Sequence, residues 1–179
     1  MRAQFWSFDV IFAMIIFGSA LILLTFVWVN ISSQYDTAYS FGLETMQAQL
    51  QSLQSRILLQ GVPSDWNSAV NITNTETWSN VSVGLGTGAG SALSMNKIAT
   101  LAAMSNYNTI TYQSTKQLLG VGYDWYIAIN YSNSTLAAGL YPYTRDPYAI
   151  QVARQSAVLN GVPVSVQIIL WTNKSFGVS

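Results

Sequence analysis

Residues 10–29 read VIFAMIIFGSALILLTFVWV, and this run decides the fold. It contains no charged residue, and Ser19 and Thr25 are its only hydroxyl residues. About 20 apolar residues in a helix span the hydrocarbon core of a bilayer, which is about 30 Å thick. The alternative is a buried core helix, but core helices rarely stay apolar on all sides over such a length. We therefore predict a membrane-spanning helix.

The flanks of this run differ from those of an ordinary secretory signal, which has a shorter apolar segment followed by a small-residue cleavage site. Here the run continues into Asn30-Ile31-Ser32 without an Ala-x-Ala site. Arg2 favours a cytoplasmic N-terminus, because basic residues are retained on the inner side of membranes. We therefore expect the C-terminal part of the chain on the outer side.

A heptad pattern continues beyond the apolar run. Apolar residues recur four, three, four, three and four positions apart, at Tyr39, Leu43, Met46, Leu50, Leu53 and Ile57. Gly61 followed by Pro63 is typical of a helix C-terminus. We predict one helix over residues 4–60, about 85 Å long at 1.5 Å per residue. A short coiled-coil stalk fits the same pattern.

Residues 61–179 predict a small α+β head domain with an antiparallel sheet of three to five strands. Residues 64–90 are rich in Asn, Thr, Ser and Gly and predict loops with short strands. Helices are expected at 94–104 and 111–119, and strands at 80–85, 124–131, 148–159 and 162–172. Asn160-Gly161 between the last two strands is the strongest short hairpin signal.

Composition argues against several classes of function. The 179 residues include seven basic and seven acidic residues, and only 8% are charged. Nucleic-acid binding needs clustered Lys and Arg, which the sequence does not contain. It also contains no Cys or His, which removes thiolate metal ligands and the commonest general base. The acidic residues form no recognisable catalytic pair, so we expect no enzyme, no catalytic residue, no cofactor and no metal site.

The repeated glycines Gly84, Gly86, Gly88 and Gly90 suggest a nucleotide-binding loop only at first sight. No acidic residue lies between Gly90 and Asp124, and no lysine stands where a phosphate-binding loop needs one. We predict a flexible surface loop instead.

The N-terminus resembles a known signal. Arg2-Ala3-Gln4, followed by FWSFD at 5–9 and the apolar run, is similar to the class III signal of archaeal type IV pilins. In that family a membrane peptidase cuts after a basic and a small residue, which places the cut between Ala3 and Gln4. The resemblance implies a leader at 1–3, a membrane and filament-core helix with its stalk at 4–60, and an extracellular head at 61–179.

The head also resembles those of secreted archaeal pilin-like proteins. The matching stretches are LLQGVPSDW at 58–66, LLG at 118–120, YDWYI at 123–127 and the final hairpin ending in Trp171, so the resemblance covers most of the chain. It implies a structural subunit of a cell-surface filament, with adhesion as one use. The implied partners are further copies of the chain, the prepilin peptidase, the pilus assembly machinery and, before assembly, the membrane. The alternative is a single-pass membrane-anchored extracellular binding or receptor domain.

The resemblance gives Asp9 a role in assembly, in which its carboxylate pairs with the new N-terminal amine of a neighbouring subunit. The family usually has glutamate here, so this chain departs from the pattern. The alternative is a solvated aspartate at the level of the lipid headgroups. A carboxylate at the bilayer centre costs about 2.5–3.5 kcal/mol on insertion scales and less near the interface.

Half of the asparagines lie in Asn-x-Ser/Thr sequons. We expect N-linked glycans on the head at Asn71, Asn80, Asn130, Asn133 and Asn173. We expect Asn30 to be bare, because a glycan directly after the apolar run would block packing of neighbouring helices. Chance in a chain rich in Ser, Thr and Asn is the alternative. The aromatic residues between 123 and 148 are expected mainly in packing, with a surface subset for subunit contacts or adhesion.

Overall fold

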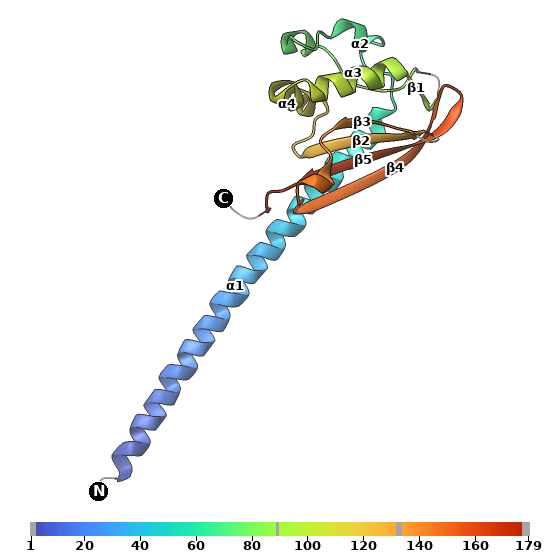
Figure 1. The fold of residues 1–179 in the computed structure, drawn as a ribbon. Coiled ribbons are helices and arrows are strands. Elements are labelled where there is room, and N and C mark those ends of the chain that lie inside the picture. The colour runs from blue at the N-terminus through green and yellow to red at the C-terminus, as the bar shows by residue number, and fades with distance from the viewer. Residues whose placement is uncertain (1–2, 89, 132–133, 177–179) are drawn as a thin grey trace. The chain divides into compact units, whose positions relative to one another are not determined.

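The computed structural model describes residues 3–88, 90–131 and 134–176, and it has the α+β fold that the sequence predicts. The elements are α1 (Ala3–Ile57), α2 (Trp66–Ala69), η1 (Thr75–Trp78), β1 (Ala92–Leu93), α3 (Met95–Asn106), α4 (Thr109–Leu118), β2 (Asp124–Tyr131), β3 (Ser134–Gly139), η2 (Pro142–Thr144), β4 (Ala149–Leu159) and β5 (Val162–Thr172) (Figure 1). The chain forms two compact units. One contains the described residues up to Gly42 together with Phe176, and the other, the head unit, is Leu43–Ser175.

Helix α1 is continuous over 55 residues, from Ala3 to Ile57. The predicted helix over 4–60 is therefore confirmed except at its C-terminal end. The helix ends in a turn in which the Leu59 N–H bonds to the Arg56 carbonyl (2.9 Å). Two residues later Gly61 has a φ of +82°. Only glycine adopts that conformation without a steric cost, which explains why the helix does not continue.

The last part of α1 belongs to the core of the head unit. Met46, Leu50, Leu53 and Ile57 are all buried, and Leu43 is partly buried. These are five of the six seam positions of the predicted heptad, so the periodicity identifies the buried side of this segment; the first position, Tyr39, is exposed. Gln47, Gln51 and other polar residues between them remain exposed, as expected for an amphipathic helix.

The head sheet has five strands in the order β1-β4-β5-β2-β3 (Figure 1). β4 with β5, β5 with β2 and β2 with β3 are antiparallel, whereas β1 runs parallel to β4 through Ala92↔Val158 and Leu93↔Leu159. The predicted antiparallel sheet is confirmed for β4, β5, β2 and β3, and the parallel pair with β1 makes the sheet mixed at one edge. A two-residue strand that pairs with a distant partner carries no alternation in sequence.

The predicted strands at 124–131 and 162–172 are confirmed, and the one at 148–159 begins one residue later. β4 and β5 pair over their full length from Ala149↔Thr172 to Leu159↔Val162. Asn160 and Gly161 form the turn with φ values of +52° and +79°, as a two-residue hairpin of this type requires. The register of the β4–β5 pair thus follows from the Asn160-Gly161 turn, which the sequence predicts.

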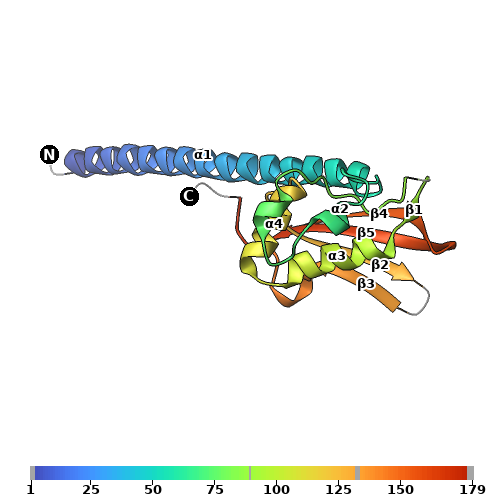
Figure 2. The ribbon, with the colours of Figure 1, turned by 90° about the horizontal axis from the view of Figure 1, so that it is seen from above.

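Helices α3 and α4 confirm the predictions at 94–104 and 111–119. α3 packs on β3 and on α4 (Figure 2), and its buried side carries Ile98, Leu101 and Met104. Asn108 and Thr111 form a reciprocal capping box at the start of α4, where the Asn108 Oδ1 accepts from the Thr111 N–H (2.9 Å). Gly120, with a φ of +62°, follows the end of α4.

The segment with the repeated glycines packs tightly against the chain that leaves α1. The Leu85 N–H bonds to the Ile57 carbonyl (2.7 Å), and the Gly86 N–H to that of Leu59 (2.9 Å). A Cβ at Gly84 would overlap the Leu59 carbonyl oxygen, and one at Gly86 would overlap that of Leu58. Gly84 and Gly86 are buried, so the predicted surface loop is wrong here.

The same contacts explain why residues 80–85 are not a strand of the sheet. Within them only an isolated bridge forms, between Ser82 and Val62. The N–H groups of Leu85 and Gly86 bond to carbonyls at and just after the end of α1. Residues 80–85 have the composition of a strand, but their neighbour here is the chain that leaves α1 rather than another strand.

Lys97 on α3 fixes this junction. Its side chain is buried, and its Nζ donates to the carbonyls of Gln60 (2.6 Å) and Gly86 (2.9 Å). Burial lowers the pKa of Lys97 from its ordinary value, and the carboxylate of Asp65 partly opposes this. The ammonium thus supplies a donor to two carbonyls, and its bond to Gly86 is buried.

Candidate functional site

The apolar run of α1 is the largest exposed apolar surface of the described chain. Large apolar side chains at residues 8–31 are exposed on every side of the helix, for example Phe12 at 62%, Ile22 at 71% and Trp28 at 71%. The helix is long and apolar enough to cross a membrane, and none of its most apolar window is buried within the described chain. A helix that is apolar all round requires lipid or other protein around it.

The polar side chains in and directly after this run bond to their own helix. Ser19 Oγ donates to the Ile15 carbonyl (2.7 Å), Thr25 Oγ1 to that of Leu21 (2.8 Å) and Asn30 Nδ2 to that of Phe26 (2.8 Å). An unpaired donor in hydrocarbon costs several kcal/mol, and these bonds remove that cost. The three residues are therefore compatible with burial in an apolar surrounding.

Asp9 lies in the second turn of α1, and its side chain is exposed. Among the described residues, its carboxylate has no hydrogen-bonded or ionic partner. The helix begins at Ala3 and continues through Gln4, so the predicted cleavage bond lies at its first residue. Met1 and Arg2 lie outside the described residues.

The predicted glycosylation sites in the head are exposed wherever the structure describes them. Asn80 lies in a turn, Asn173 in a bend and Asn130 near the end of β2, whereas Asn71 forms an isolated bridge with Asn74. In the first of these sequons the Asn71 Oδ1 accepts from both the N–H (3.0 Å) and the hydroxyl (2.8 Å) of Thr73. Asn133 lies outside the described residues, and Asn30 is exposed on α1.

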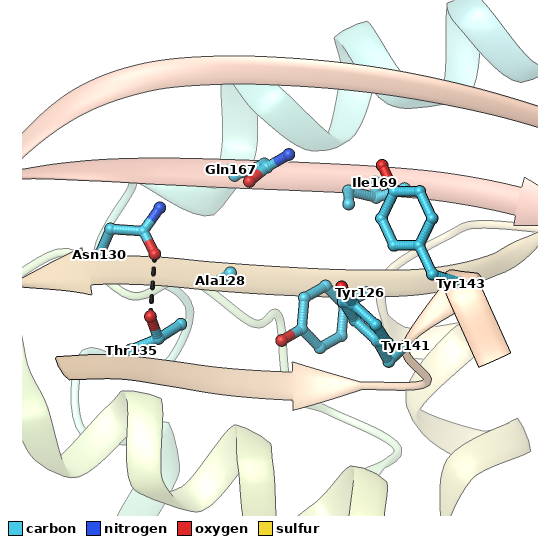
Figure 3. Close-up of a pocket in the computed structure, with 8 residues that line it drawn as sticks. All are labelled: Tyr126, Ala128, Asn130, Thr135, Tyr141, Tyr143, Gln167 and Ile169. Atoms are coloured by element: carbon cyan, nitrogen blue, oxygen red, sulfur yellow. Dashed lines mark hydrogen bonds between the residues drawn. The ribbon is translucent and has the colours of Figure 1, made fainter.

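A second site is a groove on the outer face of the sheet, which we call the tyrosine groove. Strand alternation directs Trp125, Ile127 and Ile129 of β2 into the core, whereas Tyr126 and Asn130 point to the other face. The groove has a volume of about 510 Å³. Its lining residues, drawn in Figure 3, are Tyr126, Ala128, Asn130, Thr135, Tyr141, Tyr143, Gln167 and Ile169.

Three tyrosines form one end of the tyrosine groove. Tyr126 meets Tyr141 edge to face with ring centroids 5.2 Å apart, and Tyr141 meets Tyr143 at the same distance with planes tilted by 56°. Pro142, the first residue of η2, lies between Tyr141 and Tyr143 in sequence. Figure 3 shows the three tyrosines close together at this end. Tyr143 remains 60% exposed. Burial, with a smaller contribution from Tyr141, raises the pKa of Tyr126, which keeps its hydroxyl neutral.

The other end of the groove is polar but uncharged. Register places Asn130 opposite Thr135 of β3 and Ala128 opposite Gln167 of β5. The Thr135 hydroxyl donates to the Asn130 Oδ1 (3.0 Å; Figure 3). Between the two ends lies Ala128, whose side chain is the smallest of the lining, so it fills little of the groove.

Sequence reasoning found the aromatic end of this groove only as a cluster of aromatic residues, and it missed the polar end. Asn130, Thr135 and Gln167 come from three strands, and only the pairing register brings them together. The sequence analysis does not predict β3, so nothing in it places Thr135 beside Asn130. Alternation in β2 is the one signal that separates Tyr126 from the buried Trp125.

No group of three or more Asp, Glu, His or Cys side chains is placed to hold a metal ion in the described parts of the chain. Comparisons with protein-family models, with curated proteins and with solved structures found no match to this chain.

Proposed function

We propose that this chain is the structural subunit of an extracellular filament of the archaeal type IV pilus kind. The observation that carries the proposal is helix α1, whose first part is apolar on every side and whose last part belongs to the core of a compact β-sheet head. A helix of this kind is held by lipid before assembly and by the same helix of other copies afterwards. Self-association then provides the apolar surrounding that the helix requires.

In this proposal the prepilin peptidase removes residues 1–3 by cutting between Ala3 and Gln4. The pilus assembly machinery then moves the helix from the membrane into the filament core. The Asp9 carboxylate pairs with the Gln4 amine of a neighbouring subunit, which replaces the hydration of both charges. The internal hydrogen bonds of Ser19 and Thr25 let the same helix surface enter lipid or protein at little cost.

The head faces outward and has a structural or adhesive role rather than an enzymatic one. Only 8% of the residues are charged, so other groups must solvate its surface. Glycans at the exposed Asn71, Asn80 and Asn173, and at one residue of the crowded pair Asn130 and Asn133, would supply that polar coat. Asn30 remains bare, because it would lie beside the helical core.

A single-pass membrane-anchored binding domain is the second candidate. It is favoured by α1, which has the length and composition of a membrane span, and by the tyrosine groove of the head. In this case the helix stays in the bilayer and the chain does not polymerise.

The N-terminus of the exported protein separates the two candidates. We expect a mature chain that begins at Gln4, present in surface filaments seen by electron microscopy and identified by mass spectrometry. Ala3→Tyr should abolish cleavage and filaments, because the peptidase needs a small residue there, whereas Ser7→Ala should preserve both. A mature chain that retains Met1 in a detergent-bound monomer, or that begins near Asn30, would contradict the filament proposal.

A further inference from the structure

The uncharged lining of the tyrosine groove restricts its ligand. None of its eight lining residues carries a charge; the nearest charged residue in register is Arg154, which is opposite Gln167 on β4 and does not line the groove. An ion that entered the groove would lose hydration without meeting an opposite charge among these eight residues. Arg154 is exposed on the same face as Gln167, because opposite residues of an antiparallel pair share a face, but it stands on β4 beyond the lining. The lining itself therefore favours a neutral ligand. The side-chain amides and hydroxyls of Asn130, Thr135 and Gln167 require that it also carries hydrogen-bonding groups.

The position of the groove argues against a peptide strand. Peptides that extend a sheet bind to the free backbone of an edge strand. The tyrosine groove lies over β5 and β2, each of which has a hydrogen-bonded neighbour on both sides, and the edge strand β3 contributes only Thr135 to its lining. Figure 3 shows the side chains of the lining on the face of these strands. Recognition must therefore use rings, amides and hydroxyls rather than backbone pairing.

A sugar chain has the chemistry that this lining complements. A pyranose ring presents C–H groups on its faces, which pack on aromatic rings, and hydroxyls at its edges, which pair with amides and hydroxyls. Tyr143, with 60% of its surface exposed, offers the first kind of contact, and Asn130 and Gln167 offer the second. Along β2, Tyr126 and Asn130 are four residues apart, about 13 Å at 3.3 Å per residue, so more than one ring can lie between them.

We propose that the tyrosine groove binds a neutral oligosaccharide carried by another molecule. Its volume of about 510 Å³ lies within the range of ligand pockets in proteins, about 300–1,000 Å³. The sugar stacks on the rings of Tyr126, Tyr141 and Tyr143 and extends over Ala128 to the polar end. This binding concerns the head alone and does not depend on whether the chain forms filaments.

The test uses the full chain in phosphatidylcholine nanodiscs, because maltoside detergents carry a sugar that would compete. Production in a bacterium without N-glycosylation leaves Asn130 bare, so any binding reports a sugar from another molecule. The probes are maltohexaose, cellohexaose and mannohexaose, with a hexamer of galacturonic acid as the charged comparison. We expect saturation-transfer NMR signals from at least one neutral hexasaccharide, and at least tenfold weaker binding by Tyr143→Ala and several-fold weaker binding by Gln167→Leu.

Tyr107→Ala is the matched control, because Tyr107 is 56% exposed and lies outside the groove. It should bind as the parent does, and near-UV circular dichroism should show that all three variants keep the folded head. Absence of binding to every neutral probe at millimolar concentrations would overturn the proposal. The proposal would also be overturned if Tyr107→Ala weakened sugar binding as much as Tyr143→Ala does. The same holds if the hexamer of galacturonic acid bound as tightly as the neutral hexasaccharides.

Discussion

Tyr112 shows how a single hydroxyl joins α4 to β2 of the head sheet. It donates to the Asp124 Oδ1 (3.0 Å) and accepts from the Trp125 N–H (3.2 Å), while its ring stacks nearly parallel on that of Trp125. Burial raises the pKa of Tyr112 strongly, and the Asp124 carboxylate adds to this, whereas the Trp125 N–H and Arg145 oppose it. The folded head therefore holds this tyrosine in its neutral form.

Tyr112→Phe should change how the stability of the head depends on alkaline pH. In the parent, the unfolded chain ionises Tyr112 near its ordinary pKa of 10.0 while the folded head does not, so stability falls as pH rises above 10. At neutral pH the variant should be less stable by about 1–2 kcal/mol, because it lacks the hydroxyl bonds. This deficit should shrink above pH 10, as measured by urea unfolding followed by near-UV circular dichroism.

The comparison for this prediction is Tyr107→Phe, since Tyr107 is exposed. Its stability relative to the parent should not vary with pH. A deficit of Tyr112→Phe that stays constant from pH 8 to about 11 would show that burial does not control the ionisation of this residue.

At the scale of elements, those with strong local signals could be predicted from the sequence. The hairpin at Asn160-Gly161, the strand at 124–131 and the apolar helix all carry their own turn, alternation or length signal. β3, which reads STLAAG, has no such signal and forms because β2 provides its partner over six residue pairs. The polar end of the tyrosine groove depends on that pairing, so half of the site could not be predicted.

At the junction between α1 and residues 84–86 the sequence signal was clear, but the prediction drawn from it was wrong. Gly84 and Gly86 indicated a loop, but they are needed because two backbones approach too closely for any side chain. Lys97 was not singled out, because its acceptors, the carbonyls of Gln60 and Gly86, are remote from it in sequence.

Gly86→Ala should destabilise the head by about 1–3 kcal/mol, because the added methyl group would overlap the Leu58 carbonyl and force two backbones apart. Urea unfolding of the head measures the effect. Gly122→Ala is the control, since an added Cβ there would lie 3.7 Å from the nearest atoms of the Gln49 side chain, an ordinary contact. If both variants unfold at the parent's urea concentration, the close approach at Gly86 has no energetic importance.

At the scale of the whole molecule, the proposed filament depends on interactions that no single chain can make. The apolar surface between residues 8 and 31 and the unpaired Asp9 both lack partners within the described chain. The sequence predicted the helix and its apolar character, because both are local. It could not reveal the surroundings of the helix, because those belong to other molecules.

Asp9→Ala should reduce filament yield much more than membrane insertion. An apolar residue inserts at least as well as a carboxylate, so the amount of membrane-bound precursor should be unchanged. Loss of the pairing with a neighbouring amine should lower assembled subunits at least tenfold, as counted by immunoblotting of sheared surface filaments. Asp36→Ala, which changes an exposed acid beyond the apolar run, is the control and should assemble normally. Normal filament numbers from Asp9→Ala would leave this acid as an interface residue only.

The distribution of tryptophans gives the unlabelled chain two distinct fluorescence signals. Trp66, Trp78, Trp125 and Trp171 are at most 2% exposed and lie in the head core, whereas Trp28 is 71% exposed near the end of the apolar run. Indole side chains favour the boundary between lipid and water, so Trp28 is suited to report its own surroundings. The emission of the core indoles follows the folding of the head. The emission of Trp28, together with that of Trp6 on the same helix, follows the transfer of the helix between lipid, water and protein, so the two processes can be observed in one sample.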